Sequence, residues 1–134
     1  MKALKFNHKA KHPLHRLPFI GSKSKSMLGF SFWNVPSAGG YEGGCMTGNA
    51  LAWLFLKSIE SNSYVCPNVL SSIIIDITGT ENLSKQGQII GFFEVIEAVL
   101  SKLITDYSIH FPKDEKELLA KANAGLNHVN EEQA

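Results

Sequence analysis

The 134-residue chain has little of several residue types, and each scarcity excludes a class of protein. Its two cysteines, Cys45 and Cys66, are too few for the disulfide framework of a small secreted domain. The longest apolar stretch is interrupted by Glu94, Glu97 and Lys102, so it is a poor membrane-spanning candidate. The charged first residues contain no apolar signal-peptide core. We therefore expect a cytoplasmic protein that makes no use of a membrane.

Arginine is scarce in the whole chain, and acidic residues are absent from its first part. Arg16 is the only arginine, which weakens the case for specific DNA recognition because arginine best contacts phosphates and base edges. No acid precedes Glu42, whereas residues 1–26 hold seven basic residues, and the remainder holds six basic and twelve acidic residues.

This asymmetry divides the chain into a basic N-terminal arm, residues 1–26, and a single domain, residues 27–134. Such an arm predicts an acidic or nucleic-acid partner surface, or it folds back on the acidic body of its own chain. Its candidate contact residues are Lys9, Lys11, Arg16, Lys23 and Lys25.

Apolar residues make up 44% of the chain and charged residues 19%, which is typical of a globular domain and not of disorder. Aromatic and β-branched runs predict strands near residues 27–35 and 70–77, and a third near 108–111. Helical periodicity and end signals predict helices near residues 48–61, 83–106 and 113–124. Alternating strands and helices predict an α+β domain, a small sheet packed by helices.

A glycine-rich stretch, GGYEGGCMTGNA from Gly39 to Ala50, falls between a predicted strand and a predicted helix. Backbone N–H groups at such a position bind phosphates. Gly43 and Gly48 have the spacing of a phosphate loop, but Asn49 and Ala50 replace the lysine and hydroxyl residue that an NTPase needs. A nucleotide or another anion remains a candidate ligand. The residues predicted to bind it are Gly43, Gly44, Thr47, Gly48 and Asn49.

The same stretch contains a candidate for catalysis, Cys45. It precedes the predicted helix N-terminus, where a thiolate is favoured, and it would need a histidine base from elsewhere in the chain. Metal binding by His8, His12 and His15 is disfavoured, because Pro13 interrupts the helix that would align them. We expect no metal and no cofactor.

The glycines can also have a purely structural role, which requires fewer assumptions than anion binding or cysteine catalysis. A rigid loop would present Tyr41 and Glu42 at its tip, and exposed tyrosine is favoured at protein interfaces. Gly87 and Gly91 share one face of the 83–106 helix, where another backbone can approach closely, and we assign that packing to the sheet. We therefore expect a non-enzymatic binding protein, with a small-molecule site at Gly39–Asn49 as the alternative. Homo-oligomerisation stays open.

Two segments carry a resemblance to known proteins. FWNVPSAGGYEGGCMTGNALAWLFLKSI and GQIIGFFEVIEAVL are similar to small proteins carried by plasmids and prophages of proteobacteria. The aromatic run Phe30–Trp33, the turn Gly39–Tyr41 and the helix Ala50–Ile59 also resemble antirestriction proteins of the KlcA and ArdB kind. The resemblance covers about a third of the chain and transfers no functional residue. It implies an accessory protein of a mobile genetic element, a phage or a plasmid, that inhibits a host defence complex by protein–protein interaction.

Overall fold

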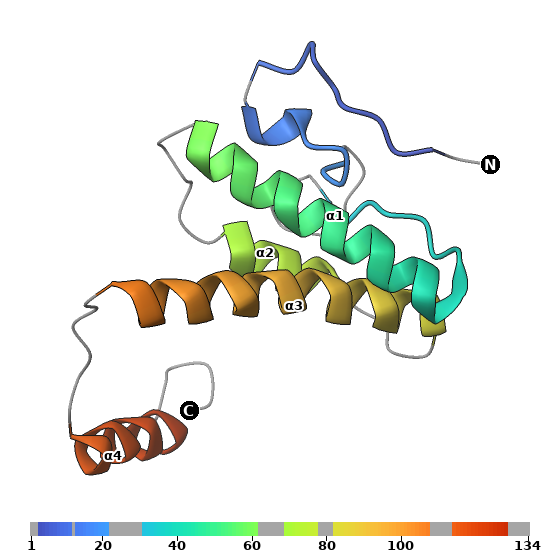
Figure 1. The fold of residues 1–134 in the computed structure, drawn as a ribbon. Coiled ribbons are helices and arrows are strands. Elements are labelled where there is room, and N and C mark those ends of the chain that lie inside the picture. The colour runs from blue at the N-terminus through green and yellow to red at the C-terminus, as the bar shows by residue number, and fades with distance from the viewer. Residues whose placement is uncertain are drawn as a thin grey trace. The chain divides into compact units, whose positions relative to one another are not determined.

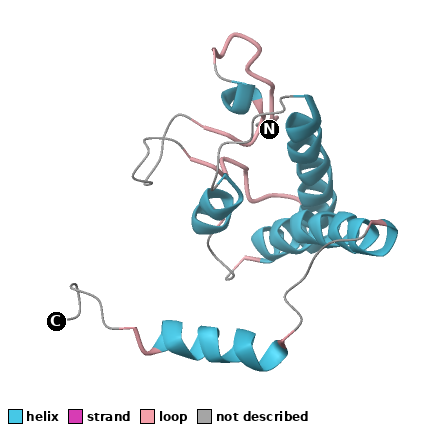
Figure 2. Ribbon diagram, turned by 90° about the vertical axis from the view of Figure 1, so that its left-hand side faces the viewer, coloured by secondary structure: helices cyan, strands magenta, loops and turns pink. Residues whose placement is uncertain are grey.

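A computed structural model describes residues 3–11, 13–21, 31–61, 69–77, 82–107 and 114–128. The helices in these ranges are a short 3₁₀ helix and four α-helices: η1 (Pro13–Arg16), α1 (Gly40–Ser61), α2 (Val69–Asp76), α3 (Leu83–Asp106) and α4 (Glu115–Leu126) (Figure 1). Within the described ranges no strand forms, and the antiparallel bridge between Gly21 and Ser31 is isolated (Figure 2). The α+β prediction is therefore wrong, and the described part of the chain is all-α.

The predicted strand near residues 70–77 is helix α2. Val69, Ile73 and Ile77 are buried, whereas Ile74 and Ile75 are exposed. Burial at every fourth residue marks one face of a helix, whereas a half-buried strand would alternate. A short apolar run does not distinguish a buried strand from a helix by composition, so packing decided the outcome against β-branched propensity.

The predicted strand near residues 27–35 is, in its described part, extended chain without a sheet. The Phe32 N–H donates to Asp76 Oδ2 at 2.8 Å, and the Asn34 N–H donates to the Phe19 carbonyl at 2.7 Å. A side chain and one neighbouring segment therefore satisfy backbone groups that a sheet ladder would otherwise pair. Residues 27–30 and the strand predicted near 108–111 lie outside the described residues.

The three predicted helices are confirmed, although two of them have different ends. Helix α3 has the predicted bounds, and α4 is displaced by two residues. Helix α1 begins at Gly40, so most of the glycine-rich stretch is helical and not a loop. Gly39 and Gly40 have φ values of 90° and 68°, which glycine adopts without a Cβ clash, and they turn the chain into the helix.

The core is centred on Phe92 of α3, whose side chain is fully buried. Its ring centroid lies 5.3 Å from that of Trp33, 6.3 Å from that of Phe19 and 6.0 Å from that of Phe55. One ring thus joins four segments that are far apart in the sequence. Gln88, one turn earlier, is also fully buried and accepts a hydrogen bond from the Trp33 indole at 2.9 Å, so the indole N–H is satisfied inside the core.

Helices α1 and α3 cross at two pairs of glycines (Figure 1). Gly44 and Gly48 of α1 meet the backbone of α3, and Gly87 and Gly91 of α3 meet the backbone of α1. A Cβ added at Gly48 would lie 2.8 Å from the Phe92 nitrogen, which is closer than real Cβ atoms come. The predicted close approach at Gly87 and Gly91 is confirmed, but its partner is a helix and not a sheet.

The chain divides into two compact units, Met1–Ser101 and Lys102–Ala134. Helix α4 belongs to the second unit, and Asp114 caps it by accepting from the Lys116 and Glu117 N–H groups at 3.0 and 3.2 Å. The helix has no buried residue, and its three leucines are exposed: Leu118, Leu119 and Leu126. None of the described helices combines the length and the apolar character that crossing a membrane requires.

Candidate partner-binding site

The five residues predicted to bind a small anion all lie inside α1. The Gly43 N–H donates to the Gly39 carbonyl at 3.1 Å, and the N–H groups that follow are those of a helix interior, which donate along the helix. Gly44 and Gly48 are buried against α3, and Thr47 and Asn49 are half-buried. Gly44 and Gly48 serve the helix crossing. Anion binding here stays a prediction without structural support.

Cys45 is half-buried and lies one turn after Tyr41 on the same helix. A hydrogen bond with Cys45, together with the charges of Cys45 and Glu94, raises the pKa of the Tyr41 phenol above its usual value. Tyr41 and Glu42 are both exposed on the first turn of α1. Cys66 lies outside the described residues, and the described part of the chain gathers no cluster of side chains that could hold a metal ion.

The N-terminal segment, residues 3–21, is attached to the body of the first unit by apolar side chains. Leu17 and Phe19 are buried in the core, and the Asn7 N–H donates to the Arg16 carbonyl at 3.1 Å within the segment. The core therefore contains residues from within the predicted arm. Its described cations are all exposed: Lys5, Lys9, Lys11 and Arg16. Lys23 and Lys25 lie outside the described residues.

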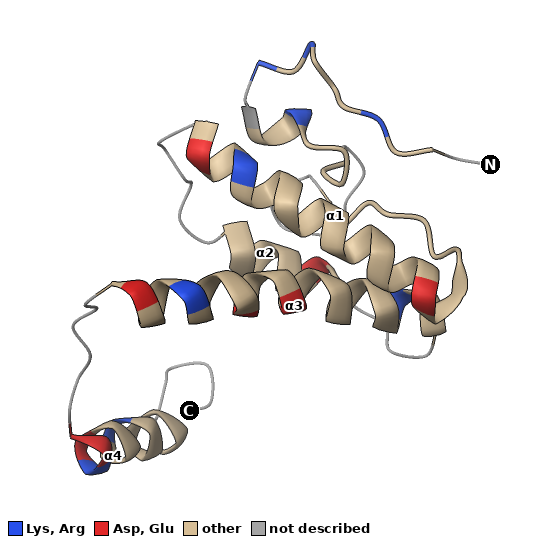
Figure 3. Ribbon diagram, in the orientation of Figure 1, with Lys and Arg blue, Asp and Glu red and all other residues tan. Residues whose placement is uncertain are grey.

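Lys57 of α1 is a further exposed cation, and it lines one hollow together with Arg16. We call the side chains of Lys5, Lys9, Lys11, Arg16 and Lys57 the basic surface, and Figure 3 shows lysine and arginine positions on both the N-terminal segment and α1. The ion pairs of the described ranges lie elsewhere, between Lys102 and Asp106 at 3.1 Å and between Lys121 and Glu117 at 3.4 Å. Within those ranges, the cations of the basic surface pair with no acid. They are therefore available to an anionic partner.

The basic surface borders a small hollow, here called the Phe6 pocket, of about 240 Å³. The N-terminal segment and the last turns of α1 line it, with Phe6, Arg16, Leu17, Leu54, Lys57 and Ser61 among the lining residues. Its lining combines apolar side chains with two cations, Arg16 and Lys57. The Phe6 ring stacks on His8 with centroids 5.6 Å apart, and Arg16 Nε donates to the Ala10 carbonyl at 2.9 Å. These contacts hold an aromatic ring and a guanidinium at the pocket.

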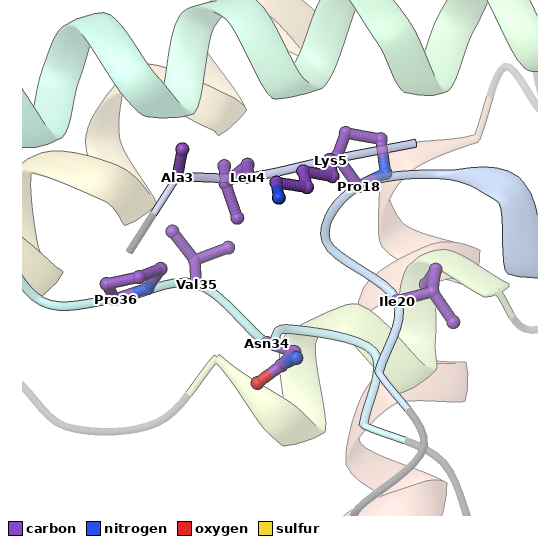
Figure 4. Close-up of a pocket in the computed structure, with 8 residues that line it drawn as sticks. All are labelled: Ala3, Leu4, Lys5, Pro18, Ile20, Asn34, Val35 and Pro36. Atoms are coloured by element: carbon purple, nitrogen blue, oxygen red, sulfur yellow. The ribbon is translucent and has the colours of Figure 1, made fainter. Parts of the chain in front are cut away.

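A second hollow, of about 470 Å³, lies between residues 3–5 and residues 34–36 (Figure 4). Pro18 and Ile20 complete its wall. Its volume suits a small ligand, but among the described residues that line it the only polar side chains are those of Lys5 and Asn34. A small-molecule site needs several convergent polar groups to orient its ligand, so this hollow is the weaker candidate.

Of the described residues that line the Phe6 pocket, only Arg16 was a candidate in the sequence analysis, and the residues that it missed include Phe6, Lys57 and Ser61. They are distant in the sequence, and only the packing of the N-terminal segment on α1 brings them together. The available signals are an aromatic residue among lysines and a lone lysine in an apolar helix. Comparison with known proteins adds no residue to this site, since no family model, curated protein or solved structure matches the chain.

Proposed function

We propose that the chain is a non-enzymatic binding protein that attaches to an acidic protein surface through its basic surface. The observation that carries the proposal is the set of exposed cations, without acidic partners in the described ranges, on a segment anchored by Leu17 and Phe19. An anchored array loses less conformational entropy on binding than a free arm would, so more of its interaction energy appears as affinity.

The specific form of this function follows from the resemblance stated above. An accessory protein of a mobile genetic element would inhibit a cytoplasmic host defence complex by covering an acidic face of it. Inhibition by attachment needs no catalytic group. This is consistent with a glycine-rich stretch that supports the helix crossing in place of a ligand loop.

A charge-neutralised variant tests the proposal. The triple variant Lys5→Gln/Lys9→Gln/Lys11→Gln should bind a labelled glutamate-rich peptide about tenfold more weakly than the unmodified chain, measured by fluorescence anisotropy. The factor follows from three exposed charge contacts of about 0.5 kcal/mol each. Added salt should weaken the binding, because these contacts are screened.

The matched control is Lys102→Gln/Lys116→Gln/Lys121→Gln, which removes the same charge from exposed positions outside the basic surface. It should leave the affinity unchanged. The proposal fails if the unmodified chain does not bind the acidic peptide, or if both triple variants lose affinity equally. Tighter binding to a DNA duplex, falling steeply with salt, would replace the acidic protein with a nucleic acid.

A further inference from the structure

We propose that the Phe6 pocket seats one apolar side chain of an acidic segment in the partner protein. This inference rests on the proposed function, because it specifies which part of the acidic partner surface contacts the chain. The segment would carry a leucine or phenylalanine with aspartate or glutamate on either side. The apolar side chain would select the segment, and the carboxylates would hold it.

The apolar part of the pocket is partly uncovered. Phe6 is 48% exposed although it is a large aromatic residue, and Leu17 and Leu54 line the same pocket. Exposed apolar surface at such a pocket favours binding, because a partner side chain that covers it removes apolar area from water. Aromatic and apolar anchors in such hollows carry most of the affinity of many interfaces.

The charged part of the pocket complements a carboxylate on the same segment. Arg16 binds the Ala10 carbonyl through Nε, which leaves the two terminal nitrogens of the guanidinium for a carboxylate in the bidentate geometry that arginine favours. Lys57 supplies a second positive charge from α1. Glu60 is exposed on the same turn as Lys57 but does not line the pocket.

The size of the pocket favours a side chain over a whole small molecule. Its volume of about 240 Å³ is below the range of about 300–1,000 Å³ typical of small-molecule sites. Lys5, Lys9 and Lys11 lie in the segment that forms one wall, so acids beyond the anchor would meet further cations. An extended acidic peptide with one apolar anchor therefore satisfies both the shape and the charge of the site.

The test uses the full chain and two labelled peptides that share acidic flanks and differ in one central residue, phenylalanine or alanine. The unmodified chain should bind the phenylalanine peptide about tenfold more tightly, because the ring is taken out of water. Ser61→Phe, which places a ring at the pocket wall, should abolish this preference and leave the affinity for the alanine peptide unchanged.

Ala50→Phe is the matched control, since Ala50 is exposed on the same helix and does not line the pocket. It should keep the preference intact. Phe6→Ser changes an exposed residue outside the core and should also reduce the preference, so the test does not depend on one variant folding. Circular dichroism and thermal unfolding verify that each variant is folded.

The outcomes separate this inference from the proposed function. Equal binding of both peptides, or a preference that survives Ser61→Phe and Phe6→Ser, overturns the pocket assignment and leaves the proposed function standing. If neither acidic peptide binds, both fail together. Displacement of the phenylalanine peptide by laurate at lower concentration than by the unlabelled peptide would assign the pocket to a fatty acid and also overturn the inference.

Discussion

Gly43 and Gly44 are neighbours in helix α1, yet they differ in what surrounds them. A Cβ at Gly44 would lie 3.0 Å from the Gln88 nitrogen of α3, whereas a Cβ at Gly43 would meet nothing closer than the Ala38 carbonyl oxygen at 3.9 Å. Of these two glycines, only Gly44 is therefore required for the helix crossing. Gly43 carries the ordinary cost of glycine in a helix, about 1 kcal/mol relative to alanine.

Alanine substitutions at these two positions should consequently have opposite effects. We expect Gly44→Ala to lower the free energy of unfolding by about 3 kcal/mol, because the added methyl group forces two backbones apart. Gly43→Ala should raise it by about 0.5–1 kcal/mol. Urea denaturation of both variants measures the difference. Equal changes in the two variants would contradict the crossing described above.

At the scale of single elements, α4 depends on local interactions more than the other α-helices do. Its 12 residues include no buried side chain, whereas each of the other three α-helices buries residues in the core. An isolated helix of this length is marginally stable in water. The cap by Asp114 therefore contributes a large share of its stability.

Amide hydrogen exchange should reveal this dependence. The amides of α4 should exchange faster than those near Phe92 in α3, and Asp114→Ala should accelerate them about fivefold, the equivalent of about 1 kcal/mol of lost capping. Asp106→Ala removes an exposed carboxylate at the end of α3 and should not change exchange in α4. Protection of α4 equal to that of the core of α3 would show that another surface covers its leucines.

At the scale of the whole molecule, the N-terminal segment combines two roles. Its lysines belong to the basic surface, and its Leu17 and Phe19 side chains complete the core around Phe92. A chain cut within this segment therefore loses charge or core packing, depending on where the cut falls. The predicted division at residues 26 and 27 would instead allow the whole arm to be removed without loss of stability.

Two truncations distinguish these alternatives. Removing residues 1–11 takes away four lysines and should lower the free energy of unfolding by about 1 kcal/mol, since Leu4 is only partly buried. Removing residues 1–20 also takes away Leu17 and Phe19 and should cost about 4 kcal/mol more, because both are fully packed. Thermal unfolding measures both. Equal stability of the two truncated chains would support a separable arm.

The sequence by itself determined the features that depend on neighbours along the chain. The periodicity of residues 83–106 predicted α3 at its observed bounds, and the spacing of Gly87 and Gly91 predicted a close backbone approach. The excess of basic residues before Glu42 predicted a basic N-terminal arm, and the described lysines of that arm are exposed. Each of these is local, so composition and period suffice to find it.

Only the tertiary structure decided which segments of the chain pack against one another. Residues 69–76 are helical because Val69 and Ile73 pack into the core, although their β-branched composition favours a strand. Helix α1 extends back to Gly40 because the glycines that disfavour a helix allow α3 to approach. Phe6 and Lys57 line one pocket because the N-terminal segment packs on α1. Burial couples distant segments, and its free energy outweighs local preferences of about 1 kcal/mol per residue.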